Sequence, residues 1–229
     1  LTAALNFAIP PAVRLDLSLD ANRDDIGAYY GTPLVPAAIA AQPTGVVSDA
    51  RGRVIDESLA RENYNVADGL MKADSLWLRA RLAWQLAPGW QLRNEVSRYT
   101  ADRHWRNSES ASFAAPDRVN RDQVDISHDH TVWGDRLDLS HQGAWLGLAN
   151  RFIVGLELNR TRFGSQRRFS DGSTSTDALL QVAAANPVVG TYNSSPALAT
   201  GGGNRTDSFA DIDVSSVFAE DAIKPVAGL

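Results

Sequence analysis

The sequence predicts an all-β protein, a section of an antiparallel up-and-down transmembrane β-barrel with long extracellular loops and short periplasmic turns. Two observations carry this prediction. Apolar and polar residues alternate along several segments, and the connections between these segments alternate between short and long. A third observation is that tryptophans lie close to the short connections.

The alternation is clearest in the first segment. From Val13 to Asp20 every odd position is aliphatic and every even position is polar. Because successive side chains of a strand point to opposite faces of a sheet, this pattern predicts one apolar face and one face in water. Similar patterns occur at residues 76–86, 90–97 (interrupted by Asn94), 152–159 and 211–218, the last with Ile212, Val214 and Phe218 as its predicted apolar face.

The segment from Val119 to His141 changes its alternation part of the way along. Its apolar residues fall at even positions near the start, such as Val124, and at odd positions near the end, such as Leu137. An inserted residue moves later side chains to the opposite face, so the change predicts a β-bulge near Trp133 and Gly134. A tight turn at the same place is the competing interpretation, and it would reverse the direction of every later segment.

The connections alternate strictly in length. In an up-and-down barrel this order places all short turns at one rim and all long loops at the other, as in outer-membrane barrels. A soluble sandwich has no reason to sort its loops in this way. The short connections are 9–12, 87–89, 143–147 and 225–228, and the long ones are 23–74, 102–118 and 165–207.

Three tryptophans lie within a few residues of the short connections: Trp84, Trp90 and Trp145. Amphipathic rings gather at the boundary between membrane and water, so this placement indicates an aromatic girdle. The alternative is that the three rings are core tryptophans beneath hairpins.

Composition excludes several classes of protein. The chain has no run of 18 or more apolar residues for a membrane helix, and it has no cysteine for disulfides or zinc–thiolate sites. Its net charge of −5 arises from interspersed acidic and basic residues, which gives no basic surface for nucleic acid. The chain starts at Leu1 without Met and stops just after a turn signal, so both ends are expected to be cut ends.

Several stretches resemble the TonB-dependent siderophore receptors, a family of outer-membrane β-barrels, and the resemblance covers about residues 1–229. The more specific stretches are Tyr-Tyr-Gly-Thr-Pro-Leu at residues 29–34 and Val-Phe-Ala-Glu-Asp at residues 217–221. Weaker ones are Asn63-Tyr64-Asn65 followed by residues 76–82, and residues 134–139 followed by 151–158.

The resemblance implies a partial barrel of about six substantial strands and two partial ends, from which the plug domain and the closing C-terminal strands are absent. Members of the family have a plug and a 22-stranded barrel, and they import ferric siderophores or similar chelates with energy from the TonB complex. The implied location is the bacterial cell outer membrane. The implied partners are the chelate, outer-membrane lipid and, through the missing plug, TonB.

Five residues are candidates for binding such a chelate: Tyr29, Tyr30 and Tyr64 in the first long loop, and Arg103 and Trp105 in the second. Aromatic rings supply contact area at little entropic cost, and arginine binds oxygen-rich anions through paired hydrogen bonds. The alternative is that the tyrosines and the tryptophan pack the loops against one another.

No catalytic residue, metal ligand set or cofactor site is predicted. Carboxylates alternate with aliphatic residues as on the wet face of a barrel, and no Gly-x-Ser-x-Gly motif occurs. His128 and His130 share one face of a strand about 7 Å apart, but no third ligand is evident, so they are interpreted as lining a wet interior.

Two competing functions remain open at this point. A passive porin-like barrel would lack a plug encoded upstream. A soluble β-sandwich that binds carbohydrate or protein would bury the apolar face of residues 76–86 against a second sheet and would fold as a monomer in plain buffer.

Overall fold

The computed structural model describes residues 1–9, 12–27, 31–145, 147–171, 180–192 and 204–224. Long strands within these residues form one antiparallel sheet in the order β1-β2-β6-β7-β9-β10-β12. The strands of the sheet are β1 (Thr2–Ile9), β2 (Val13–Ile26), β6 (Leu70–Ala87), β7 (Trp90–Asn107), β9 (Arg118–Trp145), β10 (Leu148–Asp171) and β12 (Asn204–Lys224).

Smaller elements lie in the long connections. Two short strands extend the pairing of β9, and three others form a separate sheet in the order β3-β5-β4. They are β3 (Val35–Pro36), β4 (Pro43–Ser48), β5 (Arg53–Asp56), the 3₁₀ turn η1 (Glu57–Leu59), β8 (Ala111–Ala115) and β11 (Gln181–Ala183).

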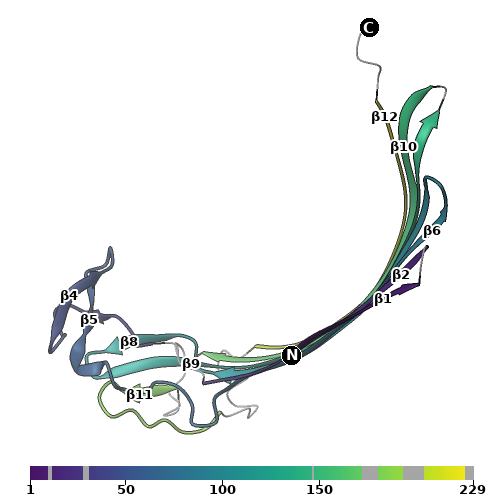
Figure 1. Cartoon of the computed structure of the whole chain (residues 1–229). Helices are drawn as coiled ribbons and strands as arrows, with labels where there is room; N and C mark the ends of the chain where they lie inside the picture. Colours follow the sequence, from purple (N-terminus) through teal and green to yellow (C-terminus); the bar gives the residue numbers. More distant parts are fainter. Residues whose placement is uncertain (10–11, 28–30, 146, 172–179, 193–203, 225–229) are drawn as a thin grey trace.

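The main sheet is an up-and-down meander with loops sorted by length. In the edge-on view of Figure 1, the short turns lie at one end of a strongly bent sheet and the long connections lie at the other. We call these the turn end and the loop end. The sorting and the all-β fold class are therefore confirmed. The sheet is not closed, because β1 and β12 each pair on one side only, and the predicted turn at 225–228 lies outside the described residues.

Strand register gives the sheet one apolar and one polar face. One cross-strand row on the apolar face is Val13, Trp84, Leu92, Leu139, Val154 and Ala219. The matching row on the polar face is Asp16, Arg81, Glu95, Arg136, Glu157 and Ser216. The alternation in the sequence therefore corresponds to two chemically different faces across most of the sheet.

The prediction of a bulge in β9 is wrong, and so is the competing prediction of a turn. β9 pairs with β7 and β10 without a register shift at Gly134, which lies opposite Ser97 on one side and Asn159 on the other. The apolar residues of β9 change from even to odd positions because the two ends of the strand have different surroundings. Val124, near the loop end, is buried on the polar face, whereas Leu137 lies on the apolar face nearer the turn end. A regular strand can bury opposite faces at its two ends.

The apolar face predicted for β12 is also wrong. Register places Phe218 opposite Gly155, together with Ile212 and Val214 on the polar face, whereas Val217 lies on the apolar face. The Phe218 ring occupies the space above Gly155, where an added Cβ would come within 2.5 Å of it. Because β12 carries apolar residues on both of its faces, its sequence pattern does not show which of them belongs to the apolar face of the sheet.

Two of the three tryptophans near the short connections are partly exposed at the turn end. Trp84 and Trp90 are 44% and 38% exposed, and the Trp90 ring lies 4.5 Å from that of His141. Neither is a buried core residue, as the alternative would require. The side chain of Trp145 lies outside the described part of the chain.

A packed core lies at the loop end. It consists of Tyr64, Val119, Val182 and Ala184, with Ala111 and Phe113 against it, so it joins all three long connections to β9. No helix in the described residues has the length and hydropathy needed to span a membrane.

Candidate ligand-binding surface

Aromatic side chains gather on the polar face at the loop-side part of three central strands. They are Trp105 of β7, His128 and His130 of β9, and Phe163 of β10, and Arg103 of β7 lies beside them. Register explains the grouping, because Arg103 lies opposite His128 and Phe163 lies opposite His130. We call these five residues the aromatic cluster.

The rings of the aromatic cluster contact one another in a chain. The Trp105 and His128 centroids are 5.0 Å apart with an interplanar angle of 86°, an edge-to-face arrangement. Phe163 lies 5.3 Å from His128 and 4.4 Å from His130. The guanidinium carbon of Arg103 lies 5.9 Å from the Trp105 ring. Such edge-to-face geometry is favourable for aromatic pairs and holds the rings in fixed orientations.

The aromatic cluster is accessible from the polar side of the sheet. The four rings are half-buried and Arg103 is exposed. A flat ligand can therefore lie against ring surface while an anionic group of the same ligand pairs with the guanidinium. The arrangement suits non-covalent binding of a bulky, oxygen-rich or aromatic anion.

Two of the five residues predicted from the sequence belong to the aromatic cluster. Arg103 and Trp105 lie in β7, so their predicted place in a loop is wrong: the β7–β9 ladder continues as far as Asn107. Tyr29 and Tyr30 lie outside the described residues, so the structure does not place them.

Tyr64 is corrected from a ligand contact to a packing residue. Only 4% of its surface is exposed, and its hydroxyl donates a hydrogen bond of 2.5 Å to the carbonyl oxygen of Ala184. A side chain covered in this way has no surface left for a chelate. It holds the first long connection against the third, as the alternative interpretation had it.

The sequence did not predict that Phe163, His128 and His130 lie in one cluster with Trp105. The sequence placed His128 and His130 on one face of a strand but gave no register between that strand and its neighbours. The signal that could have found them is the pairing of Trp145 with Leu148 across the short connection, since counting back from it pairs Phe163 with His130.

The two histidines contact aromatic rings, and the distance between their ring centroids is 6.5 Å. Within the described ranges, no group of three His, Cys, Asp or Glu side chains is placed to hold a metal ion. The contacts that the structure gives these imidazoles are with Trp105, Phe163 and each other.

No protein-family model and no curated protein matches the chain. Among solved structures, the chain is similar to the siderophore receptor PiuA from Acinetobacter baumannii, with a TM-score of 0.65 and 14% sequence identity. The similarity covers 97% of this chain and 32% of that receptor, so the chain spans about a third of its length. At this identity the likeness concerns the fold alone: the chain has the fold of a section of a β-barrel.

Proposed function

We propose that the chain is a section of an outer-membrane TonB-dependent receptor that takes up ferric siderophores or similar chelates. The observation that carries the proposal is the apolar face, which runs across the strands of the main sheet without a covering layer among the described residues. Similarity to a fold used by a siderophore receptor supports the same conclusion.

The exposure of the apolar face is too large for a surface in water. Leu78, Leu137 and Leu156 are each 37–38% exposed although they lie in central strands. Burying apolar surface stabilises a protein by about 25 cal/mol per Å², so an uncovered face of this extent requires an apolar neighbour. Lipid meets this requirement on one face, while the charged residues of the opposite face meet water.

The height of the apolar face fits a membrane. On β9 it extends from His141, against Trp90 at the turn end, to Trp133. This span is about 26 Å along the strand, or about 20 Å along the membrane normal when the strand is tilted by about 40°. Within this span β9 has one polar interruption, Asp135, which accepts a 2.6 Å hydrogen bond from Asn94. From the row of Trp133 outward the same face becomes charged, because Arg160 lies opposite Trp133 and pairs with Asp211 at 2.7 Å. An outer-membrane barrel has an apolar band of about 25 Å.

The aromatic cluster then lies on the water-filled side of the barrel, near its external mouth. A chelate entering from the loop end would meet the Trp105 and Phe163 rings and the guanidinium of Arg103. Energy coupling through TonB would require a plug domain supplied by another part of the receptor.

Paired cysteine labels test the membrane orientation. The chain has no native cysteine, so single variants carry one label each. In bilayers, labels on Leu78→Cys, Leu82→Cys and Leu156→Cys should be quenched by lipid-soluble probes. Labels on the neighbouring polar-face positions Arg79→Cys, Arg81→Cys and Glu157→Cys should be quenched by water-soluble probes. Leucine positions shielded from both probes would refute the membrane assignment in favour of a soluble sandwich.

Alanine variants test the ligand assignment separately. Trp105→Ala and Phe163→Ala, in the receptor that contains this section, should each weaken binding of a ferric chelate by about tenfold, because each removes ring surface worth about 1–2 kcal/mol. The control is Trp77→Ala, which removes a polar-face ring of β6 outside the aromatic cluster. Equal affinities in all variants would reject the aromatic cluster as the binding surface and leave the membrane orientation standing.

A further inference from the structure

The apolar face carries a hollow near its loop-side margin, which we call the lower hollow. It has a volume of about 660 Å³ and lies across β1, β2, β6 and β7. Its lining includes Leu5, Leu17, Leu78, Ala80 and Val96. Ala80 lies directly between Leu17 and Val96 in the cross-strand row, so a short side chain among longer ones leaves the depression.

Two residues of different chemistry line the loop-side margin of the lower hollow. Arg98 and Trp133 also belong to its lining, and they lie directly opposite each other in the β7–β9 ladder. Trp133 is 39% exposed and Arg98 is exposed. Tryptophan and arginine at the boundary of an apolar surface are typical of the level where lipid headgroups begin.

Arg98 differs from the other cations of this face. Arg23, Lys72 and Arg160 each form an ion pair with an aspartate, at 3.5, 3.4 and 2.7 Å. Among the described residues, Arg98 has no hydrogen bond, ion pair or ring contact. Asp135, one row nearer the turn end, accepts a 2.6 Å hydrogen bond from Asn94 and does not line the lower hollow. The Arg98 guanidinium is therefore free to bind an external anion.

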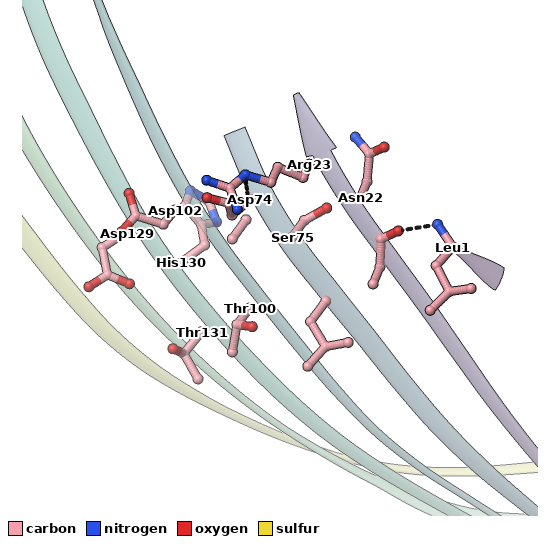
Figure 2. A pocket seen from close by; sticks show the side chains of 13 residues that line it. Leu1, Asn22, Arg23, Asp74, Ser75, Thr100, Asp102, Asp129, His130 and Thr131 are labelled. Atoms are coloured by element: carbon pink, nitrogen blue, oxygen red, sulfur yellow. Dashed lines mark hydrogen bonds and ion pairs between the residues drawn. The ribbon is translucent and has the colours of Figure 1, made fainter. Parts of the chain in front are cut away.

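A second hollow, the upper hollow, lies directly beyond this margin and is shown in Figure 2. Its volume is about 800 Å³. Thr100 and Thr131, the row next to Arg98 and Trp133, lie side by side in it. Three aspartates occupy one row farther out, and they are Asp74, Asp102 and Asp129. The upper hollow thus offers hydroxyls, carboxylates and the guanidinium of Arg23, which pairs with Asp74, where the lower one offers hydrocarbon.

We infer that the two hollows together bind one phosphate-bearing lipid from the membrane leaflet on the loop side. An acyl chain lies in the lower hollow, the phosphate pairs with Arg98, and the outer headgroup contacts Thr100 and Thr131. This inference rests on the proposed function, because it requires lipid against the apolar face.

Charge fixes where the phosphate lies. Arginine binds phosphate through two parallel hydrogen bonds, and a guanidinium next to hydrocarbon is weakly screened. Arg23 offsets the charge of Asp74, but Asp102 and Asp129 would repel a phosphate placed farther out. The same carboxylates accept hydrogen bonds from hydroxyl groups. The preferred lipid therefore has a single phosphate beside its acyl chains and hydroxyl donors beyond it.

The test measures lipid binding to the receptor that contains this section, reconstituted in vesicles. Phosphatidylglycerol with brominated acyl chains is the probe, and an uncharged galactolipid with the same chains is the comparison lipid. Bromine quenches the fluorescence of nearby indoles. The readout is the quenching of tryptophan emission in the unaltered protein minus the quenching in Trp133→Phe, which gives the contribution of Trp133 alone. Phosphatidylglycerol should quench Trp133 at a concentration at least tenfold lower than the galactolipid, and millimolar inorganic phosphate should not displace it.

Variants assign the preference to the hollows. Arg98→Gln should abolish the tenfold preference, whereas Arg93→Gln, which removes an exposed cation from the polar face of the same strand, should retain it. Ala80→Leu fills the lower hollow and should weaken quenching by both lipids. Equal quenching by both lipids in the unaltered chain, an unchanged preference in Arg98→Gln, or displacement by inorganic phosphate would overturn the inference. Absence of quenching by either lipid would instead refute the membrane orientation on which it rests.

Discussion

The two ends of β9 are built for different surroundings. Near its start, Arg121, Asp122 and Gln123 are only 1%, 5% and 0% exposed, so polar side chains form an interior. Near its end, Trp133 and Leu137 are 39% and 37% exposed, so apolar side chains form a surface. Along one regular strand, the side chains thus change from buried and polar at the loop end to exposed and apolar at the turn end.

The two charged residues of this polar interior, Arg121 and Asp122, are stabilised by hydrogen bonds to the long connections. Arg121 donates to the carbonyl oxygens of Tyr64, Asn65, Val188 and Val189. The Asp122 carboxylate accepts from the backbone and hydroxyl of Ser110 and from the backbone of Glu109. The loop end therefore carries its own core, whereas the stability of the turn end depends on whatever covers its apolar face.

The largest expected effect follows from removing the arginine at the centre of the loop end. Arg121→Leu leaves four backbone carbonyls without their donor in a buried place, which should cost on the order of 3–5 kcal/mol. The first and third long connections should then detach from β9. Hydrogen exchange should accelerate around residues 64–69 and 184–190, while protection of residues 135–142 stays unchanged.

Arg118→Leu is the matched control, since Arg118 lies on the same strand but is exposed. Its hydrogen-exchange pattern should match that of the unaltered chain. Loss of protection throughout β9 in Arg121→Leu would contradict the independence of the two ends.

The next largest effect tests the turn end. Leu156→Arg places a charge in the middle of the apolar face and should destabilise the membrane-inserted protein by about 2–4 kcal/mol. Thr161→Arg, on the polar face of the same strand, should change stability by less than about 1 kcal/mol. Urea unfolding in lipid vesicles measures both, and equal losses would remove the distinction between the faces.

The sequence predicted the turn end better than the loop end for a physical reason. At the turn end each face has one environment, so the period-2 pattern from Val13 to Leu19 alone assigns apolar and polar sides. Loop sorting then gives the up-and-down order. At the loop end both faces are covered, so the parity of Val124 reports burial by distant segments and was misread as a bulge.

The aromatic cluster shows the corresponding limit for sites. Trp105 and Arg103 could be chosen because their residue types suit an anionic ligand. Their partners on β9 and β10 follow only from the register of two further strand pairs, which side-chain chemistry does not encode. Tyr64 was misassigned because a loop tyrosine that packs and one that binds have the same sequence signal.

A smaller effect is expected from the Tyr64 hydroxyl. Tyr64→Phe keeps the ring in the core but leaves the Ala184 carbonyl unpaired, which should cost about 1–2 kcal/mol of loop-end stability. Tyr99→Phe is the control, because its ring lies edge-on to Trp77 at 6.4 Å and loses no hydrogen bond identified among the described residues. Limited proteolysis near residues 184–190 should distinguish them, and equal cleavage rates would show that the Tyr64 hydroxyl does not hold the third long connection in place.

The smallest effect is a pH dependence in the small β3-β5-β4 sheet. Burial of Asp56 disfavours its charge, but hydrogen bonds from the Ser58 side chain and from the backbone amides of Ala41, Ser58 and Gln42 outweigh this, so its pKa lies below the usual 3.8. A carboxylate with a lowered folded pKa stabilises the fold fully above pH 3.8, and this contribution is lost as the pH falls through the folded value. Amide protection factors at Ala41 and Gln42 should therefore decrease below pH 3.8 in the unaltered chain. Asp56→Asn cannot titrate, so its protection factors should be lower at neutral pH and should change less on acidification; a parallel decrease in both proteins would assign the acid sensitivity to other groups.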